Sequence, residues 1–134
     1  MIAVDTSVVV AGLASWHEAH PAARAALAQR PRLPAHVALE AYSVLTRLPP
    51  PHRFPARLVT ELIAAHFPGA PLTLPGRQQA SLIALAVERG ITGGAIYDAL
   101  VAATAKHSNA TLLTRDLRAI PVYERLGAAF ELVG

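Results

Sequence analysis

The stretch MIAVDTSVVV (residues 1–10) places one carboxylate, Asp5, inside an otherwise apolar segment. Its apolar residues predict a short buried strand over residues 2–5, followed by a helix that Thr6 or Ser7 could cap. An ionised carboxylate buried without partners is strongly disfavoured, so other groups must compensate the charge of Asp5. Other residues that carry oxygen atoms in similar surroundings should show which group compensates this charge.

The size and composition of the chain indicate one domain over residues 1–134, long enough to bury a substantial core. Hydrophobic residues make up 53% of the chain and charged residues only 16%, which suggests that a partner covers some apolar surface. The absence of cysteine excludes disulfides and thiolate metal sites. No apolar run is long enough to span a membrane, and we expect a soluble, cytoplasmic protein.

The basic residues are eleven arginines and Lys106, and the formal net charge is +3. A small positive excess fits a polyanionic partner such as nucleic acid. It fits equally well a genome whose codon usage favours arginine, so the charge alone does not decide between these interpretations.

Short apolar segments alternate with amphipathic ones along the rest of the chain. Further strands are predicted over residues 32–37, 71–74, 110–114 and 128–133, and helices over residues 15–30, 36–48, 56–67, 77–90 and 93–108. This alternation is typical of an α/β fold in which helices cover both faces of a parallel sheet. Ligand sites in such folds lie beyond the carboxyl ends of the strands, where Asp5 is expected.

Four of the nine acidic residues have apolar surroundings. Asp5 and Asp116 follow predicted strands, whereas Glu40 and Asp98 lie on apolar faces of predicted helices. Each has an ordinary explanation when taken alone, because a strand-end acid can cap a helix, Glu40 can pair with an arginine, and Asp98 suits the first turn of its helix. A common site at one rim of the sheet explains all four together.

The remaining acids give weaker signals. Glu61 is a rival candidate because its predicted helix is also apolar, whereas four others are interpreted as solvated: Glu18, Glu88, Glu124 and Glu131. Trp16 and Tyr97 could stack on a nucleic-acid base, although aromatic residues in such helices more often belong to the core.

Four carboxylates in one place would repel one another, and without a counter-ion some of them would take up protons. A divalent cation removes this difficulty, and oxygen-only ligands favour Mg²⁺ or Mn²⁺ over zinc. Magnesium keeps several waters and binds through one or two carboxylates plus a substrate phosphate. That combination is the chemistry of phosphodiester hydrolysis.

The four acids also lie in motifs that resemble those of the PIN-domain ribonucleases, specifically the VapC toxins of bacterial toxin–antitoxin pairs. The motifs are VDTSVVV (residues 4–10), ALEAYSVLTRL (38–48), GGAIYDALVAATA (93–105) and ATLLTRD (110–116). Each motif is weak alone, but their order and spacing together cover essentially the whole chain. The resemblance implies a three-layer α/β/α sandwich with a central, mostly parallel sheet.

The resemblance also implies a Mg²⁺- or Mn²⁺-dependent endoribonuclease that cuts structured RNA with a metal-bound water. Its catalytic carboxylates would be Asp5, Glu40, Asp98 and Asp116, and the metal ligands among them Asp5, Asp98 and Asp116. Thr6 and Thr114 match small hydroxyl residues that would orient these carboxylates by hydrogen bonds. Arg115 could contact an RNA phosphate or simply offset the local negative charge, and the second role is preferred.

The partners that the resemblance implies are the RNA substrate, a second copy of the chain in a homodimer, and a cognate antitoxin. Contact with DNA would be indirect, through the antitoxin, and no membrane partner is expected. The segment from Pro49 to Pro75 matches no motif of the family and is a candidate for partner contacts. Two alternatives remain: a housekeeping RNA-processing or DNA nuclease of the same fold, and an inactive PIN-like binding module.

Overall fold

Three short strands and seven helices make up the chain, and the computed structural model describes all of residues 1–134. Each of the three strands is shorter than the predicted segment to which it corresponds, whereas the helices account for most of the chain. In chain order the elements are β1 (Ile2–Val4), α1 (Thr6–Leu13), α2 (His20–Ala28), α3 (Ala35–Thr46), α4 (Ala56–His66), α5 (Gly76–Arg89), α6 (Ala95–His107), β2 (Thr111–Thr114), α7 (Ile120–Arg125) and β3 (Phe130–Leu132).

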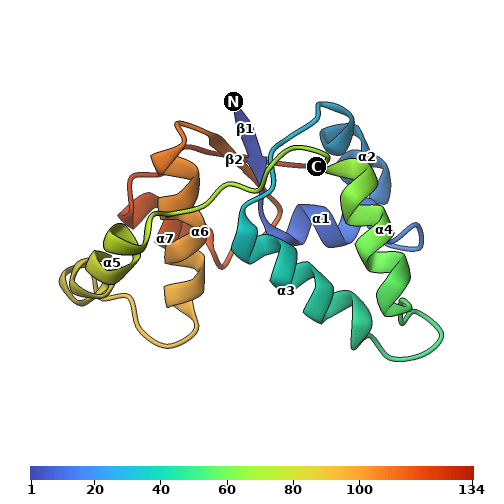
Figure 1. Cartoon of the computed structure of the whole chain (residues 1–134), viewed down its shortest axis with the longest axis horizontal. Helices are drawn as coiled ribbons and strands as arrows, with labels where there is room; N and C mark the ends of the chain where they lie inside the picture. Colours follow the sequence, from blue (N-terminus) through green and yellow to red (C-terminus); the bar gives the residue numbers. More distant parts are fainter.

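The strands form one parallel sheet in the order β1-β2-β3, with helices arranged around it (Figure 1). Successive side chains of a strand point to opposite faces, and both Leu112 and Leu113 of the central strand are buried. Both faces of the sheet are therefore covered, and α1 and α6 pack against β2. The predicted α/β/α arrangement with a central parallel sheet is confirmed.

The register of the sheet brings the ends of β1 and β2 together. Val4 lies opposite Leu113, and the N–H of Asp5 donates to the Leu113 carbonyl oxygen at 3.1 Å. Asp5 and the residues that follow Thr114 therefore lie at the same carboxyl rim of the sheet. This placement agrees with the position expected of ligand sites in parallel sheets.

Two predicted strands are reduced to isolated bridges. Within residues 32–37 only Arg32 and Pro34 pair, with Ala3 and Leu72 respectively, and Leu72 is the one paired residue of the predicted strand over residues 71–74. Proline cannot donate to a ladder, and prolines at 31, 34, 71 and 75 interrupt the pairing in both segments.

The predicted helix over residues 15–30 begins later, at His20. A helix beginning at Ser15 would have Pro21 in its interior, where the ring clashes with the preceding turn, whereas Pro21 is tolerated in the first turn of α2. Gly90 ends α5 in the left-handed conformation (φ 67°), as predicted. The short helix α7 was not predicted. None of the seven helices has both the length and the apolarity needed to cross a membrane.

The prediction that Thr6 or Ser7 caps the first helix is wrong. Asp5 is the N-cap of α1, and its side chain accepts hydrogen bonds from the N–H groups of Ser7 and Val8. An aspartate is as good a cap as serine, and Asp5 is the last residue before the helical backbone begins.

The core should depend most on the central strand. We expect Leu112→Ala to lower the free energy of unfolding by about 2–5 kcal/mol, because Leu112 is fully buried and its truncation leaves a cavity. Urea denaturation followed by circular dichroism measures this loss. Leu117→Ala, at a leucine exposed to solvent, is the matched control and should stay within about 0.5 kcal/mol of the wild type. Equal effects of the two variants would contradict the assigned core.

Candidate active site

Asp5 is buried, with 4% of its surface exposed, and protein groups surround its carboxylate. Oδ1 accepts hydrogen bonds from the Ser7 N–H at 3.0 Å, the Val8 N–H at 3.4 Å and the Ser7 hydroxyl. Oδ2 accepts a hydrogen bond from the Tyr123 hydroxyl at 2.8 Å. Both oxygens are therefore partnered, so the fold itself compensates much of the desolvation of this charge.

Tyr123 is the site residue that sequence reasoning missed most clearly. It lies on α7, is almost fully buried, and donates to Asp5 across a separation of 118 residues. Burial, and then the neighbouring Asp5 carboxylate, raise the pKa of Tyr123, so the hydroxyl keeps its proton and remains a donor. No local pattern links these two residues, because only the packing of α7 against the sheet brings them together.

Ser7 connects two segments at the carboxyl rim. Its hydroxyl donates to Asp5 and accepts from the N–H of Arg115 at 2.8 Å, which ties the start of α1 to the segment after β2. The Thr114 hydroxyl accepts from the N–H of Asp116 at 3.0 Å and so positions the backbone before that carboxylate. Ser7 and Thr114 thus orient the two strand-end acids through short local contacts.

Thr6 contacts a different carboxylate from the one it follows in sequence. Its hydroxyl donates to Glu40 Oε1 at 3.2 Å, which connects α1 to α3. The same oxygen lies 3.4 Å from Nε2 of His36, one turn earlier on α3. Glu40 is therefore held by Thr6, and His36 lies beside it without a hydrogen bond, although neither contact was predicted.

All four candidate carboxylates line one pocket of about 420 Å³ at the carboxyl rim. They come from the end of β1, from α3, from α6 and from the segment after β2. Four cationic or potentially cationic side chains share the lining: His17, Arg47, Arg115 and Arg118. The other lining residues are Thr6, Ser7, Val10, Val44, Val101 and Tyr123.

Asp98 is the carboxylate of the pocket whose pKa is clearly shifted. Burial, followed by repulsion from Asp116 and Glu40, raises its pKa to about 6, although Arg118 opposes the shift. Arg118 reaches Asp116 Oδ2 at 3.4 Å but is largely exposed, so this ion pair offsets little of the charge. The carboxylates are therefore close enough to repel one another, as expected of a pocket that accommodates a cation.

The donor chemistry of the pocket fits a hard divalent cation, since four carboxylates line it and neither cysteine nor methionine does. No group of three or more histidine, aspartate or glutamate side chains is close enough to hold an ion jointly. Magnesium typically takes only one or two protein carboxylates and completes its shell with waters and substrate phosphate. Asp98 and Asp116, whose carboxylates repel each other, are therefore the pair whose chemistry best suits such an ion, and Asp5 lines the same pocket.

The structure places the remaining candidates outside this pocket, with one exception. Glu61 is exposed on α4, away from the pocket lining, and the four acids interpreted as solvated are also exposed. Arg115 does line the pocket, and its Nε is buried without a hydrogen-bond partner. The expectation that Trp16 and Tyr97 belong to the core is wrong, because they are 46% and 55% exposed.

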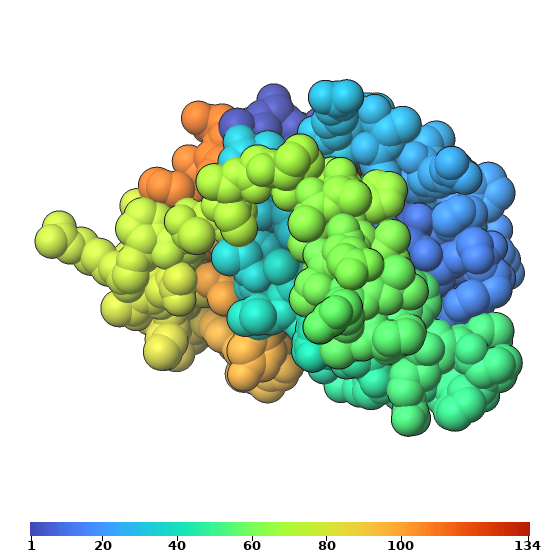
Figure 2. All heavy atoms as spheres, turned by 45° about the vertical axis from the view of Figure 1, so that its right-hand side comes forward, coloured from blue at the N-terminus to red at the C-terminus, as the bar shows by residue number.

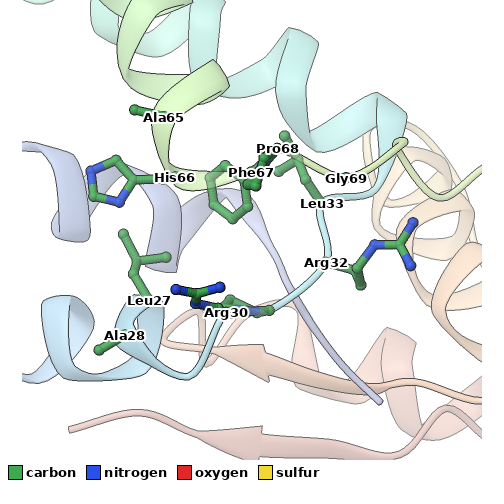
Figure 3. Close-up of a pocket in the computed structure, with 11 residues that line it drawn as sticks. Leu27, Ala28, Arg30, Arg32, Leu33, Ala65, His66, Phe67, Pro68 and Gly69 are labelled. Atoms are coloured by element: carbon green, nitrogen blue, oxygen red, sulfur yellow. The ribbon is translucent and has the colours of Figure 1, made fainter.

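A second pocket, of about 560 Å³, lies between the end of α2 and the end of α4 (Figure 3). It contains no carboxylate and is lined by apolar and cationic residues. In Figure 3 the Phe67 ring points toward Leu27 and Arg30, whereas Arg32 points away to the other side. This second pocket therefore offers no carboxylate for a metal ion.

Comparison with known proteins agrees with this geometry. Residues 2–125 match the PIN domain family. The chain belongs to the PIN domain family. It is 53% identical to ribonuclease VapC40 of Mycobacterium tuberculosis, with 99% of each chain covered. It is also 46% identical to ribonuclease VapC27 of the same species, with 94% of this chain and 92% of the relative covered.

Solved structures show the same fold. The structure of FitAcB from Neisseria gonorrhoeae matches this PIN-domain protein with a TM-score of 0.69 over 97% of this chain and 96% of the other, at 23% identity. The structure of FitAB bound to an IR36 DNA fragment matches with the same TM-score. These structures agree in fold, while the family match and the two VapC relatives confirm the resemblance to VapC-type PIN proteins drawn from the four motifs.

The raised pKa of Asp98 predicts a stability that depends on pH. The folded-state pKa of about 6 lies above the ordinary value of 3.8, so this group stabilises the fold below pH 4 and loses that contribution as the pH rises through 6. Asp98→Asn replaces the carboxylate with a neutral amide, so the variant does not lose this stability as the pH rises. Allowing for solvent screening, the variant should be more stable than the wild type by about 1–2 kcal/mol at pH 7.5.

Urea denaturation in EDTA at pH 7.5 and pH 5 tests this expectation, and the advantage of Asp98→Asn should shrink at the lower pH. Glu61→Gln is the matched control, since Glu61 is an exposed carboxylate outside the pocket. It should stay within about 0.5 kcal/mol of the wild type at both pH values. An Asp98→Asn advantage that is independent of pH would contradict the raised pKa.

Proposed function

We propose that this protein is an endoribonuclease that acts as the toxin of a toxin–antitoxin pair in the cytoplasm. It would hydrolyse phosphodiester bonds in structured RNA with a Mg²⁺- or Mn²⁺-activated water. The observation that carries the proposal is the convergence of Asp5, Glu40, Asp98 and Asp116 on one pocket. Full-length similarity to proteins named as VapC ribonucleases supports the choice of substrate and biological role.

Each carboxylate has a distinct environment from which a role follows. Asp5 is fixed in orientation by Ser7 and Tyr123, so it is a rigid ligand. In the proposed site Asp98 and Asp116 would approach the ion beside Asp5, and their mutual repulsion would be relieved on binding. When bound, Mg²⁺ or Mn²⁺ would supply a water of lowered pKa and neutralise charge on the scissile phosphate.

Glu40 and the arginines complete the assignment. Glu40 accepts a hydrogen bond on one oxygen from Thr6 and lies beside His36, which suits a group that orients or deprotonates a water. RNA phosphates would be repelled by the acids alone, so the pocket arginines are assigned to phosphate contacts. Arg115 is the strongest of these, because it lines the pocket and forms no ion pair with a carboxylate, and this favours phosphate contact over the charge-balancing role preferred from sequence.

Cleavage of total RNA by the purified protein, free of antitoxin, tests the proposal. We expect discrete fragments with Mg²⁺ or Mn²⁺, none with EDTA, and a loss of rate of about 100-fold or more for Asp98→Asn, since an ion contributes several kcal/mol to transition-state stabilisation. Glu61→Gln should retain the wild-type rate. Cleavage that survived both EDTA and Asp98→Asn would contradict the metal assignment.

We further propose that the protein forms a homodimer through an apolar surface on α3, α5 and α6. Ile83 and Val87 lie one turn apart on α5 and are both largely exposed, as are Leu39 on α3 and Tyr97 on α6. Ile83 and Tyr97 line the same small pocket, and Tyr97 stacks on His36 of α3, which makes the surface continuous. Exposed apolar area of this kind marks an interaction site.

Sedimentation velocity at micromolar concentration measures the oligomeric state. Val87→Glu should shift the protein from dimer to monomer, because it would bury a charge without a partner in the interface. Leu58→Glu, at an exposed leucine on α4, should leave the dimer intact. A wild-type monomer, or a dimer indifferent to Val87→Glu, would contradict this assignment.

The pocket between α2 and α4 is the proposed docking place for a segment of the cognate antitoxin. Phe67, Leu27 and Leu33 supply apolar surface there, while Arg30 supplies a cationic group and His66 an imidazole. This combination favours a segment that carries both apolar and acidic side chains. His66 and Phe67 also belong to the segment between Pro49 and Pro75 for which partner contacts were expected. Any contact with DNA would be made by the antitoxin.

A further inference from the structure

An exposed aromatic pair lies beside the acidic pocket and takes no part in the roles assigned above. Trp16, in the connection over residues 14–19, and His52, in the connection over residues 47–55, have ring centroids 4.2 Å apart and ring planes inclined by 33°. Figure 2 shows these two segments in contact at the right of the molecule, the first in blue and the second in green. Two loops far apart in sequence thus form one aromatic surface.

The exposure of Trp16 is not explained by core packing. It is the only tryptophan of the chain, and 46% of its surface is open to solvent. Tryptophan is among the most buried side chains on average, since its ring system removes a large apolar area from water. His52 is itself exposed and covers only part of the indole. The remaining open face of Trp16 is available to a flat ligand.

His17 connects the aromatic pair to the acidic pocket. Its ring centroid lies 5.9 Å from that of Trp16, and His17 lines the pocket that holds the four carboxylates. Its orientation is fixed, because Nδ1 accepts the N–H of Ala19 at 3.0 Å. Arg47 lines the same pocket and begins the connection that carries His52. Both loops therefore contribute one residue to the pocket and one to the aromatic pair.

We infer that Trp16 and His52 form a stacking site for one unpaired RNA base next to the scissile phosphate. The inference rests on the proposed function and adds a substrate subsite to it. Every base has a π-face that stacks on aromatic side chains, and a base inside a duplex has both faces covered. His17 and Arg47 lie where the phosphates of the stacked nucleotide would pass toward the carboxylates. The site would therefore select a single-stranded region at the point of cleavage.

The single tryptophan makes binding directly observable. An RNA oligonucleotide that spans a mapped cleavage site is titrated into the Asp98→Asn variant, so that the RNA stays intact. We expect Trp16 fluorescence to change with the same dissociation constant that the anisotropy of fluorescein-labelled RNA reports. Unchanged tryptophan emission at RNA concentrations that saturate the anisotropy signal would overturn the inference.

Cleavage kinetics supply the second test. On intact RNA, Trp16→Ala should raise KM about 5- to 20-fold with little change in kcat. This effect lies in the lower part of the range for base–aromatic stacking, because Trp16 is only half-buried. An RNA with an abasic residue beside the cleavage site should show the same loss with the wild type and no additional loss with Trp16→Ala. If the abasic residue and Trp16→Ala each reduced cleavage independently, the base would not stack on Trp16, and the inference would be overturned.

Two controls separate the possible failures. Tyr42→Ala removes an exposed aromatic side chain of α3 that does not line the pocket, and it should cleave intact RNA like the wild type. Circular dichroism and urea denaturation confirm that Trp16→Ala is folded. RNA cleavage indifferent to Trp16→Ala overturns the subsite alone, whereas a wild-type protein that cleaves no RNA with any metal overturns the proposed function and the subsite together.

Discussion

The hydrogen bonding of the Asp5 carboxylate is the constraint on which the rest of the site depends. One side chain caps α1, accepts the Ser7 hydroxyl that also binds the backbone of Arg115, and accepts the Tyr123 hydroxyl from α7. These contacts join the ends of β1 and β2 to the start of α1 and to α7. Losing any hydrogen bond to a buried charge costs free energy, so each of these elements is held in a defined position around Asp5.

The pocket also holds an acid with a different environment. Burial, followed by repulsion from Asp116 and Glu40, raises the pKa of Asp98, which contributes its carboxylate from α6. One acid is thus fixed and another is poised to exchange a proton or bind a cation. Such a division between carboxylates is how a single pocket acquires groups with different roles.

Sequence reasoning located the four acids because each departs from its surroundings. A carboxylate in a run of valines, or on a helix face of alanines, is unusual enough to identify without a structure. Gly90 correctly predicted the end of α5, whereas the start of α2 was predicted too early because Pro21 requires a place in the first turn. The same reasoning failed for the strands over residues 32–37 and 71–74, because apolar composition indicated a strand while proline removed the ladder hydrogen bonds.

The sequence by itself determined the fold class and the set of acidic residues, since strand and helix periods and isolated buried charges are local signals. It did not determine which groups hold those acids. Tyr123 donates a hydrogen bond to Asp5 across 118 residues, and Thr6 donates one to Glu40 across 34. The sequence around each of these residues does not indicate its hydrogen-bond partner. Only the tertiary structure decided these pairings, together with the exposure of Trp16 beside His52, because packing of the helices around the sheet brings distant side chains within hydrogen-bonding or stacking distance.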